Sequence, residues 1–239
     1  MRDSNMDNQS HLSTQNKLRN LIGQLLDKRV IPFLGAGVSK NSVHRDGTEG
    51  LCKTEEMSEK LKEAIKNLLA SKNVGNKDLA IWANDQYNES SLSKLCEIFL
   101  WLKGTNSEKE LVNILEIEKF SELKPLSAHR YIAFLAREGL IDEVITTNYD
   151  DCLEEAYRNT FPISKNDPWS DGQPSQVVHD LRKFRYHAGK NSIYLNGKFQ
   201  PFLKIYKING CATALCKDKK AENILLTEAQ LQEWRERQW

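Results

Sequence analysis

A glycine-rich turn behind an apolar run is the first feature of this chain whose residue types and spacing could bind a ligand. Residues 30–34 read Val-Ile-Pro-Phe-Leu, then come Gly35, Ala36 and Gly37, with Ser39 shortly after. Such a run is typical of a buried parallel strand, and glycines behind it let the backbone approach a ligand with no Cβ in the way. A helix after the turn would direct its free N–H groups at a phosphate. The pattern predicts a strand that ends on a nucleotide; the alternative is a glycine turn without a ligand.

A second apolar run ends in polar side chains. Residues 140–146 are followed by Thr147, Asn148, Tyr149 and Asp150. Ligands of open α/β sheets lie beyond the carboxyl ends of the strands, so Asn148 and Asp150 are predicted to lie at that edge. The alternative is helix capping, because aspartate is a preferred N-cap residue and Asp150 or Asp151 could cap the helix expected next.

The elements around these motifs follow from apolar spacing and turn residues. Leucines and isoleucines at helical spacing predict a helix over residues 14–29, preceded by a disordered tail at 1–13. Pro32 fits the first strand only near its beginning, because proline lacks the N–H that a sheet requires. Helical stripes dominate residues 51–125, which we interpret as a helical insertion over the mouth of the sheet. Further expected elements are a helix over 127–138, strands over 141–147, 203–209 and 224–226, an irregular loop over 160–176, a hairpin turn at 194–197, and a helix from Glu228 capped by Thr227.

The two motifs in this order resemble the sirtuin-like superfamily, and in particular its bacterial antiviral-defence branch, whose members hydrolyse NAD. Softer matches fall in the right order at residues 50–52, 125–129, 204–210 and 225–228. The resemblance covers roughly residues 30–239. It implies an α/β fold with a Rossmann-like parallel sheet and a helical insertion, so that residues 14–239 form one NAD-binding domain. The fold has further strands after the last expected helix, and we expect those C-terminal strands to be absent from this chain.

The resemblance also implies roles for the residues of both motifs. Asn148 matches the asparagine that contacts the ribose and the attacking water, and Asp150 matches the acid that faces the nicotinamide carboxamide. Ser39 and the backbone of the glycine turn match the groups that hold phosphates or ribose. The predicted cofactor-binding residues are Gly35, Ala36, Gly37, Ser39, Thr147, Asp150 and Asn209.

The catalytic base is where this sequence departs from the sirtuin pattern. Asn209 stands where sirtuins have a histidine, and asparagine cannot act as a general base at neutral pH. His187 lies at a distance from Asn148 broadly similar to that in related defence NADases, so we predict it to be the base, with His179 as the alternative. A surface histidine remains the other interpretation of His187. We expect His129 to cap or pack the start of a helix.

Composition excludes several classes of protein. The 239 residues contain 34 Lys and Arg against 33 Asp and Glu, a formal net charge of +1, which argues against nucleic-acid binding. Mean hydropathy is −0.60, and no apolar stretch has membrane-spanning length. The polar N-terminus lacks the apolar segment of a signal peptide. The sequence therefore predicts a cytoplasmic protein with no direct contact to nucleic acid or membrane.

Cysteine spacing and the missing histidine separate the possible functions. The five cysteines form no Cys-x-x-Cys pair, so we predict reduced thiols and no metal. The function implied by the resemblance is an NAD hydrolase of antiphage defence, with NAD as substrate, assembling with itself or with a HerA-type ATPase that translocates DNA. A sensor or assembly module that binds NAD or ADP-ribose is the alternative. A protein deacylase is disfavoured, because the chain lacks both the Cys-x-x-Cys pairs and the His-Gly of sirtuins.

Overall fold

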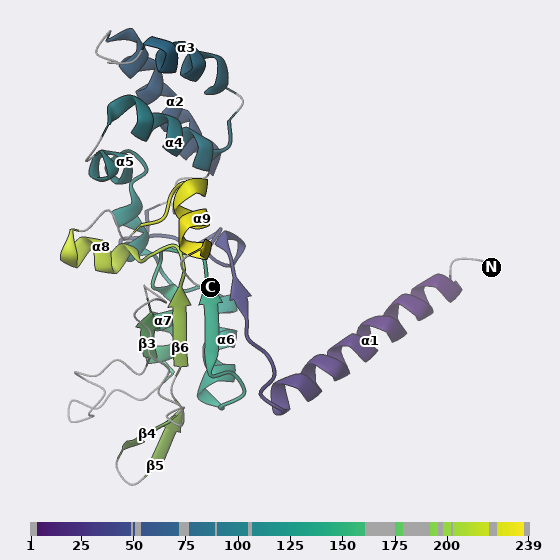
Figure 1. Ribbon diagram of the computed structural model, residues 1–239. Helices are drawn as coiled ribbons and strands as arrows, with labels where there is room; N and C mark the ends of the chain where they lie inside the picture. The colour runs from purple at the N-terminus through teal and green to yellow at the C-terminus, as the bar shows by residue number, and fades with distance from the viewer. Residues whose placement is uncertain are drawn as a thin grey trace.

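The computed structural model describes residues 4–48, 50, 54–71, 77–88, 90–104, 107–160, 175–178, 192–195, 198–201, 203–219 and 224–236. Over these residues the chain has a mixed α/β fold, in which a parallel sheet is joined to a mostly helical part (Figure 1). The fold class predicted from the sequence is confirmed.

Four strands form the parallel sheet. They are β1 (Phe33–Leu34), β2 (Glu143–Thr146), β3 (Ser175–Val178) and β6 (Leu203–Lys207), in the order β1-β2-β6-β3. Leu34 pairs with Thr146, and Thr146 pairs in turn with Lys207. Because the strands run in the same direction, the carboxyl ends of β1, β2 and β6 meet at one edge of the sheet.

Pro32 lies just before β1, at the position where a proline is tolerated. Its carbonyl oxygen accepts a hydrogen bond from the Ile145 N–H at 2.9 Å, so it takes part in the pairing without an N–H of its own. Within the described sheet β1 is also an edge strand. The expectation that Pro32 stands at the beginning of the strand is confirmed.

Two helices pack on one face of the sheet. They are α6 (Ser127–Arg137) and α7 (Cys152–Arg158). Val144 of β2 and Ile205 of β6 are register partners, and both are fully buried under these helices. Tyr157 and Ala133 complete the apolar contact from the helix side. This packing holds the carboxyl ends of β2 and β6 in a fixed relation to the starts of α6 and α7.

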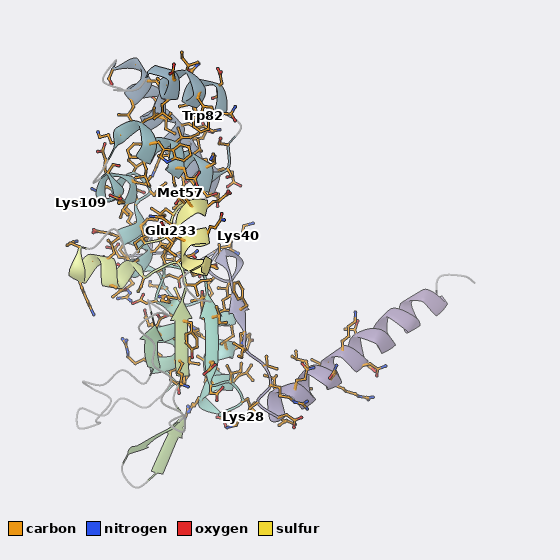
Figure 2. All side chains as sticks on the ribbon, in the orientation of Figure 1. Lys28, Lys40, Met57, Trp82, Lys109 and Glu233 are labelled. Carbon is orange, nitrogen blue, oxygen red and sulfur yellow. The ribbon has the colours of Figure 1, made fainter. Side chains whose placement is uncertain are left out.

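The helical part lies beyond the carboxyl ends of the strands (Figure 1). It consists of α2 (Thr54–Ala70), α3 (Lys77–Gln86), α4 (Leu92–Lys103), α5 (Glu108–Ile114) and the 3₁₀ helix η2 (Ile117–Glu122). The predicted stripe of α2 is buried at Met57, Leu61 and Ile65. Figure 2 labels Met57 at the end of α2 nearer the sheet and Trp82 farther from the sheet within the helical part. These helices fall within the expected insertion at 51–125, although the domain boundaries stay a prediction.

Two more helices connect the sheet to the helical part. They are α8 (Ala212–Asp218) and α9 (Glu228–Glu236). Thr227 Oγ1 accepts the Gln230 N–H at 3.1 Å, which confirms the predicted cap of α9. Ala212, Leu215 and Ile224 join the core of the helical part. The helical part is thus packed onto the segments that follow β6.

Three expectations on local structure have clear outcomes. The first helix, α1, spans Ser4–Leu26, so residues expected in a disordered tail are helical from Ser4 onward. Residues 224–226 are not a strand; they form an irregular segment, fixed by a Leu225 N–H donation to the Asn209 carbonyl at 2.9 Å. The predicted hairpin is confirmed by the antiparallel pairing of β4 (Ser192–Leu195) with β5 (Lys198–Pro201). Residues 161–174, most of the expected loop, lie outside the described residues.

Among the described helices, none combines the length and the apolar character that crossing a membrane requires.

Candidate functional site

The glycine turn lies at the carboxyl end of β1 and is open to solvent. A short 3₁₀ helix, η1 (Ala36–Val38), follows Gly35. Gly37 is exposed and has no left-handed backbone conformation, and an added Cβ would meet no atom within 4 Å. At Gly35 an added Cβ would lie 3.8 Å from Thr147 Oγ1. An added side chain would therefore meet no described protein atom at Gly37, and it would make an ordinary van der Waals contact with Thr147 at Gly35.

Ser39 joins the two sequence motifs. Its side chain is buried, and its Oγ lies 3.2 Å from Asn148 Nδ2 and 2.8 Å from Asp150 Oδ2. The Asn148 amide donates to the hydroxyl, and the hydroxyl donates to the carboxylate. The sequence predicted a direct contact of Ser39 with phosphate or ribose. In the structure the hydroxyl makes three contacts inside the protein, and its contact with a ligand stays a prediction.

Asp150 makes a different contact with each of its two carboxylate oxygens, while its predicted role facing the nicotinamide carboxamide stays a prediction. Its Oδ1 accepts the Cys152 N–H at 3.1 Å at the start of α7, which confirms the capping alternative. Its Oδ2 accepts from Ser39 and so faces the glycine turn. Asp151, the other capping candidate, makes no side-chain cap bond to α7. The cap and the contact between the motifs are therefore two functions of one carboxylate.

His129 belongs to the same hydrogen-bonded cluster as Ser39, Asn148 and Asp150. The sequence did not predict this membership. His129 Nδ1 accepts the Leu126 N–H at 3.0 Å, so the expected role at the start of α6 is confirmed. Its Nε2 lies 3.1 Å from Ser39 Oγ, a contact between residues 90 positions apart. Burial lowers the pKa of His129, and the nearby Asp150 carboxylate offsets this only in part. The ring is therefore neutral around pH 7. The sequence signal was the match at residues 125–129, which did not show what the ring would contact.

A buried lysine lies beneath Asp150. Lys207 Nζ donates to the Asp150 carbonyl oxygen and to Glu154 Oε1, the latter at 2.8 Å. Burial lowers the pKa of Lys207, but the Glu154 carboxylate and other nearby groups outweigh it and hold the pKa above its usual range. This charged pair ties the end of β6 to α7 and to the backbone of the Asn148 segment. Side chains alternate along β6, so Lys207 lies on the same buried face as Ile205. The sequence did not predict the ion pair of Lys207.

The remaining predicted residues of the two motifs lie at the same edge. Thr147 donates its N–H to the Leu34 carbonyl at 3.0 Å, and its hydroxyl approaches the same oxygen at 3.4 Å, so it secures the pairing of β1 with β2. Asn209 follows β6, and within the described residues its buried Oδ1 has no hydrogen-bond partner. An unsatisfied amide oxygen at the strand ends suits a ligand that donates a hydrogen bond.

Tyr149 anchors the segment between Asn148 and Asp150. Its hydroxyl donates to the Leu225 carbonyl at 2.7 Å, and its own carbonyl accepts the Ala212 N–H at 2.9 Å. Its ring meets that of Phe120 edge to face, with ring centroids 5.7 Å apart. The residues that hold Asn148 therefore come from the sheet, from the segments after β6 and from the helical part.

A pocket of about 360 Å³ lies beside this cluster, between the loop after Ser39 and the helical part. Its lining includes His44, Gly50, Lys60 and Phe120. Phe120 is the contact between the pocket and Tyr149. The lining of this pocket does not include Asn148 or Ser39.

The cluster also contains three side chains of a metal-ligating type. Donor atoms of His129, Asp150 and Cys152 are all buried and lie within 4.8 Å of one another. Ser39 already bridges the first two by hydrogen bonds, and burial raises the pKa of the Cys152 thiol, so the thiolate that would bind a metal is disfavoured. These contacts favour a hydrogen-bonded cluster, and the absence of a metal stays a prediction.

Two predicted histidines cannot be placed. His187 and His179 lie outside the described residues, so the choice of base stays a prediction.

Comparison with known protein families is consistent with this edge of the sheet as the site. Residues 142–239 match the family model described as the SIR2-like domain. The matched segment begins just before β2 and includes Asn148, Asp150 and Asn209, whereas the glycine turn and His129 lie before it. No curated protein matches the chain. The match supports the sirtuin-like resemblance and an NAD-related function.

Proposed function

We propose that the protein hydrolyses NAD to ADP-ribose and nicotinamide. In this reaction water adds to the ribose carbon as the bond to nicotinamide breaks, and the proton of the water passes to a base. The ribose carries positive charge in the transition state, so a site must hold the ribose and the water in place. A side chain that both donates and accepts hydrogen bonds suits this task.

The observation that carries the proposal is the contact of the two motifs through Ser39. The hydrogen bonds from Asn148 to Ser39 and from Ser39 to Asp150 place a polar amide beside an open glycine turn, at the carboxyl ends of two parallel strands. That edge is where open α/β sheets bind ligands. Within the described residues the Asn148 amide oxygen makes no hydrogen bond. It is therefore available to a ribose hydroxyl.

The direct experiment measures nicotinamide released from NAD by the purified full chain. The assay runs with and without the product of a neighbouring gene, because a defence NADase is held inactive until it is triggered. Release that rises with protein concentration supports the proposal. NAD binding without release under every activating condition would overturn it.

The Gly37→Val variant should lose NAD affinity by at least roughly tenfold while remaining folded. The added Cβ would meet no protein atom within 4 Å, so we expect the valine to occupy the space in front of the turn. Isothermal titration with NAD measures the loss. Gly23→Val is the matched control, because Gly23 lies on exposed α1 and its added Cβ also has no neighbour within 4 Å. Equal NAD affinity in both variants would contradict a nucleotide site at this turn.

The base is expected to be His187. His187→Ala should lower nicotinamide release on the order of 100-fold, since a general base contributes about that much or more. His179→Ala is the control and should retain most of the activity. The reverse ranking would transfer the role to His179, and two fully active variants would indicate that water attacks without a protein base.

A binding module without turnover is the second candidate. The observation that favours it is Asn209, which stands at the end of β6 where sirtuins have their histidine. Such a module would bind NAD or ADP-ribose and pass the signal to a partner. The nicotinamide assay separates it from the hydrolase.

We further propose that the hydrolase acts in antiphage defence by depleting NAD, as a homo-oligomer or with a HerA-type ATPase. The exposed side chains of α1 support self-association, because Leu18, Leu21, Ile22 and Leu26 lie at helical spacing and more than two fifths of each is accessible. Sedimentation of the full chain and of a variant with these four residues changed to serine tests self-association. An unchanged oligomeric state would exclude α1 from the contact.

A further inference from the structure

His129 is the side chain through which α6 reaches the site. Only 1% of its surface is exposed, and it makes two contacts that differ in kind. Nδ1 faces the backbone N–H of Leu126 at the start of α6, and Nε2 faces the Ser39 hydroxyl. One contact belongs to the helix and the other to the Asn148 cluster, and the two are made by different ring atoms.

The first contact determines which ring nitrogen carries the proton. A backbone N–H can only donate, so Nδ1 must accept and therefore has no hydrogen of its own. In a neutral ring the proton is then on Nε2. Nε2–H consequently donates to Ser39 Oγ over 3.1 Å. A charged ring would place a second donor against the Leu126 N–H.

The tautomer in turn determines the direction of the Ser39 hydroxyl. A hydroxyl has one proton and two lone pairs. With His129 and Asn148 both donating to Oγ, its only proton points to Asp150 Oδ2 at 2.8 Å. All three contacts are then hydrogen bonds with a donor and an acceptor. If Nε2 were an acceptor, the hydroxyl proton would be shared between a ring and a carboxylate, and one contact would become repulsive.

We propose that His129 is a positioning residue, which acts through Ser39 to hold the side-chain amide of Asn148 in one orientation. The inference rests on the proposed function to the extent that Asn148 is the residue that holds the ribose. With Nδ2 bound to Ser39, Oδ1 is the amide atom left for the substrate. His129 itself is too deeply buried to touch substrate. It differs from His187 and His179, the proposed candidates for the base.

Two substitutions separate the two ring contacts. In His129→Asn the side-chain oxygen is bonded to Cγ, as Nδ1 is, so the variant keeps an acceptor for Leu126 but loses the donor to Ser39. In His129→Gln the side-chain nitrogen lies two bonds from Cγ, as Nε2 does, so the variant keeps the donor to Ser39 but loses the acceptor for Leu126. Each variant is the matched control of the other.

A positioning role and a pure helix-capping role of His129 predict opposite rankings of these two variants in NAD cleavage. If His129 positions Asn148, His129→Asn should lower kcat/KM for NAD by about 10- to 100-fold, the range typical for loss of a supporting partner, and His129→Gln should be clearly more active. Thermal unfolding should rank them the other way, since only His129→Asn keeps the bond to Leu126. If His129 only caps α6, His129→Asn should be the better variant in both measurements, which would overturn the proposal.

Nuclear magnetic resonance tests the same point without turnover. In the ligand-free wild type, ¹⁵N shifts of the His129 ring should show the Nε2–H tautomer, and the Asn148 side-chain amide signals should move in His129→Asn more than in His129→Gln. An Nδ1–H tautomer, or Asn148 signals equally unchanged in both variants, would overturn the proposal. If the wild type released no nicotinamide, the hydrolase assignment would fail, while these spectra would still decide the role of His129.

Discussion

Asn148→Ala should lower NAD cleavage by roughly 100- to 1000-fold, the usual cost of losing one preorganised polar contact in an active site, while the protein stays folded. The side chain is half-buried at the end of β2, so its removal leaves no large cavity. Ser39 keeps its bonds to His129 and Asp150. Nicotinamide release measures the activity, and thermal unfolding measures the fold.

A second substitution at Asn148 separates the amide from the space that it fills. Asn148→Asp preserves the shape but removes the donor to Ser39 and adds a charge near Asp150. It should be as inactive as the alanine variant. Asn113→Ala, on the exposed side of α5, is the control and should behave as wild type. Nicotinamide release at the wild-type rate from folded Asn148→Ala would remove this residue from the mechanism.

Lys207→Met should lower the free energy of unfolding by about 3–5 kcal/mol, the usual cost of breaking a buried ion pair. Lys207 has no exposed side-chain surface, and only 5% of its partner Glu154 is exposed. Methionine has a similar length but cannot donate to Glu154 or to the Asp150 carbonyl. The Glu154 carboxylate would then be buried without its partner. Denaturant unfolding at pH 7 measures the change.

Two further variants test whether burial of the ion pair is the reason for the loss of stability in Lys207→Met. Lys219 pairs with Glu118 at 2.9 Å, almost the same distance, but the two side chains are 59% and 43% exposed. Lys219→Met should therefore lower the free energy of unfolding far less than Lys207→Met does. In the double variant Lys207→Met with Glu154→Leu both charges are absent, and most of the stability should return. Similar losses for Lys207→Met and Lys219→Met would contradict this account.

Features that depend on residues close together in the chain could be predicted from the amino-acid sequence. The apolar run before Gly35 and the run before Asn148 predicted two strands that end in polar or glycine residues, and both strands are present. The expected burial of the first strand was wrong, because β1 is a two-residue edge strand of the described sheet and its Phe33 is exposed. Apolar spacing predicted the buried stripe of α2, and Thr227 predicted the start of α9. Strand alternation, helical periodicity and capping involve residues only a few positions apart. For this reason they can be recognised without knowing the fold.

Local patterns also misled where neighbours outside the segment decide the conformation. Residues 224–226 have the composition of a strand, but they contact Asn209 and Tyr149 and join no sheet. Strand-forming residues become a strand only when a partner strand is available, and this is a property of the fold.

Which polar groups meet at the site depends on the packing of the fold and could not be predicted from the sequence. Ser39 contacts His129 and Asp150 across 90 and 111 positions of the chain, and Lys207 contacts Glu154 across 53. The sequence placed Ser39 on the ligand and His129 at a helix start, and it gave Lys207 no role. These contacts exist because α6 and α7 pack on the same face of β2 and β6, which brings the helix starts to the strand ends. Hydrogen bonds act over about 3 Å, so packing alone determines which side chains come close enough to form them.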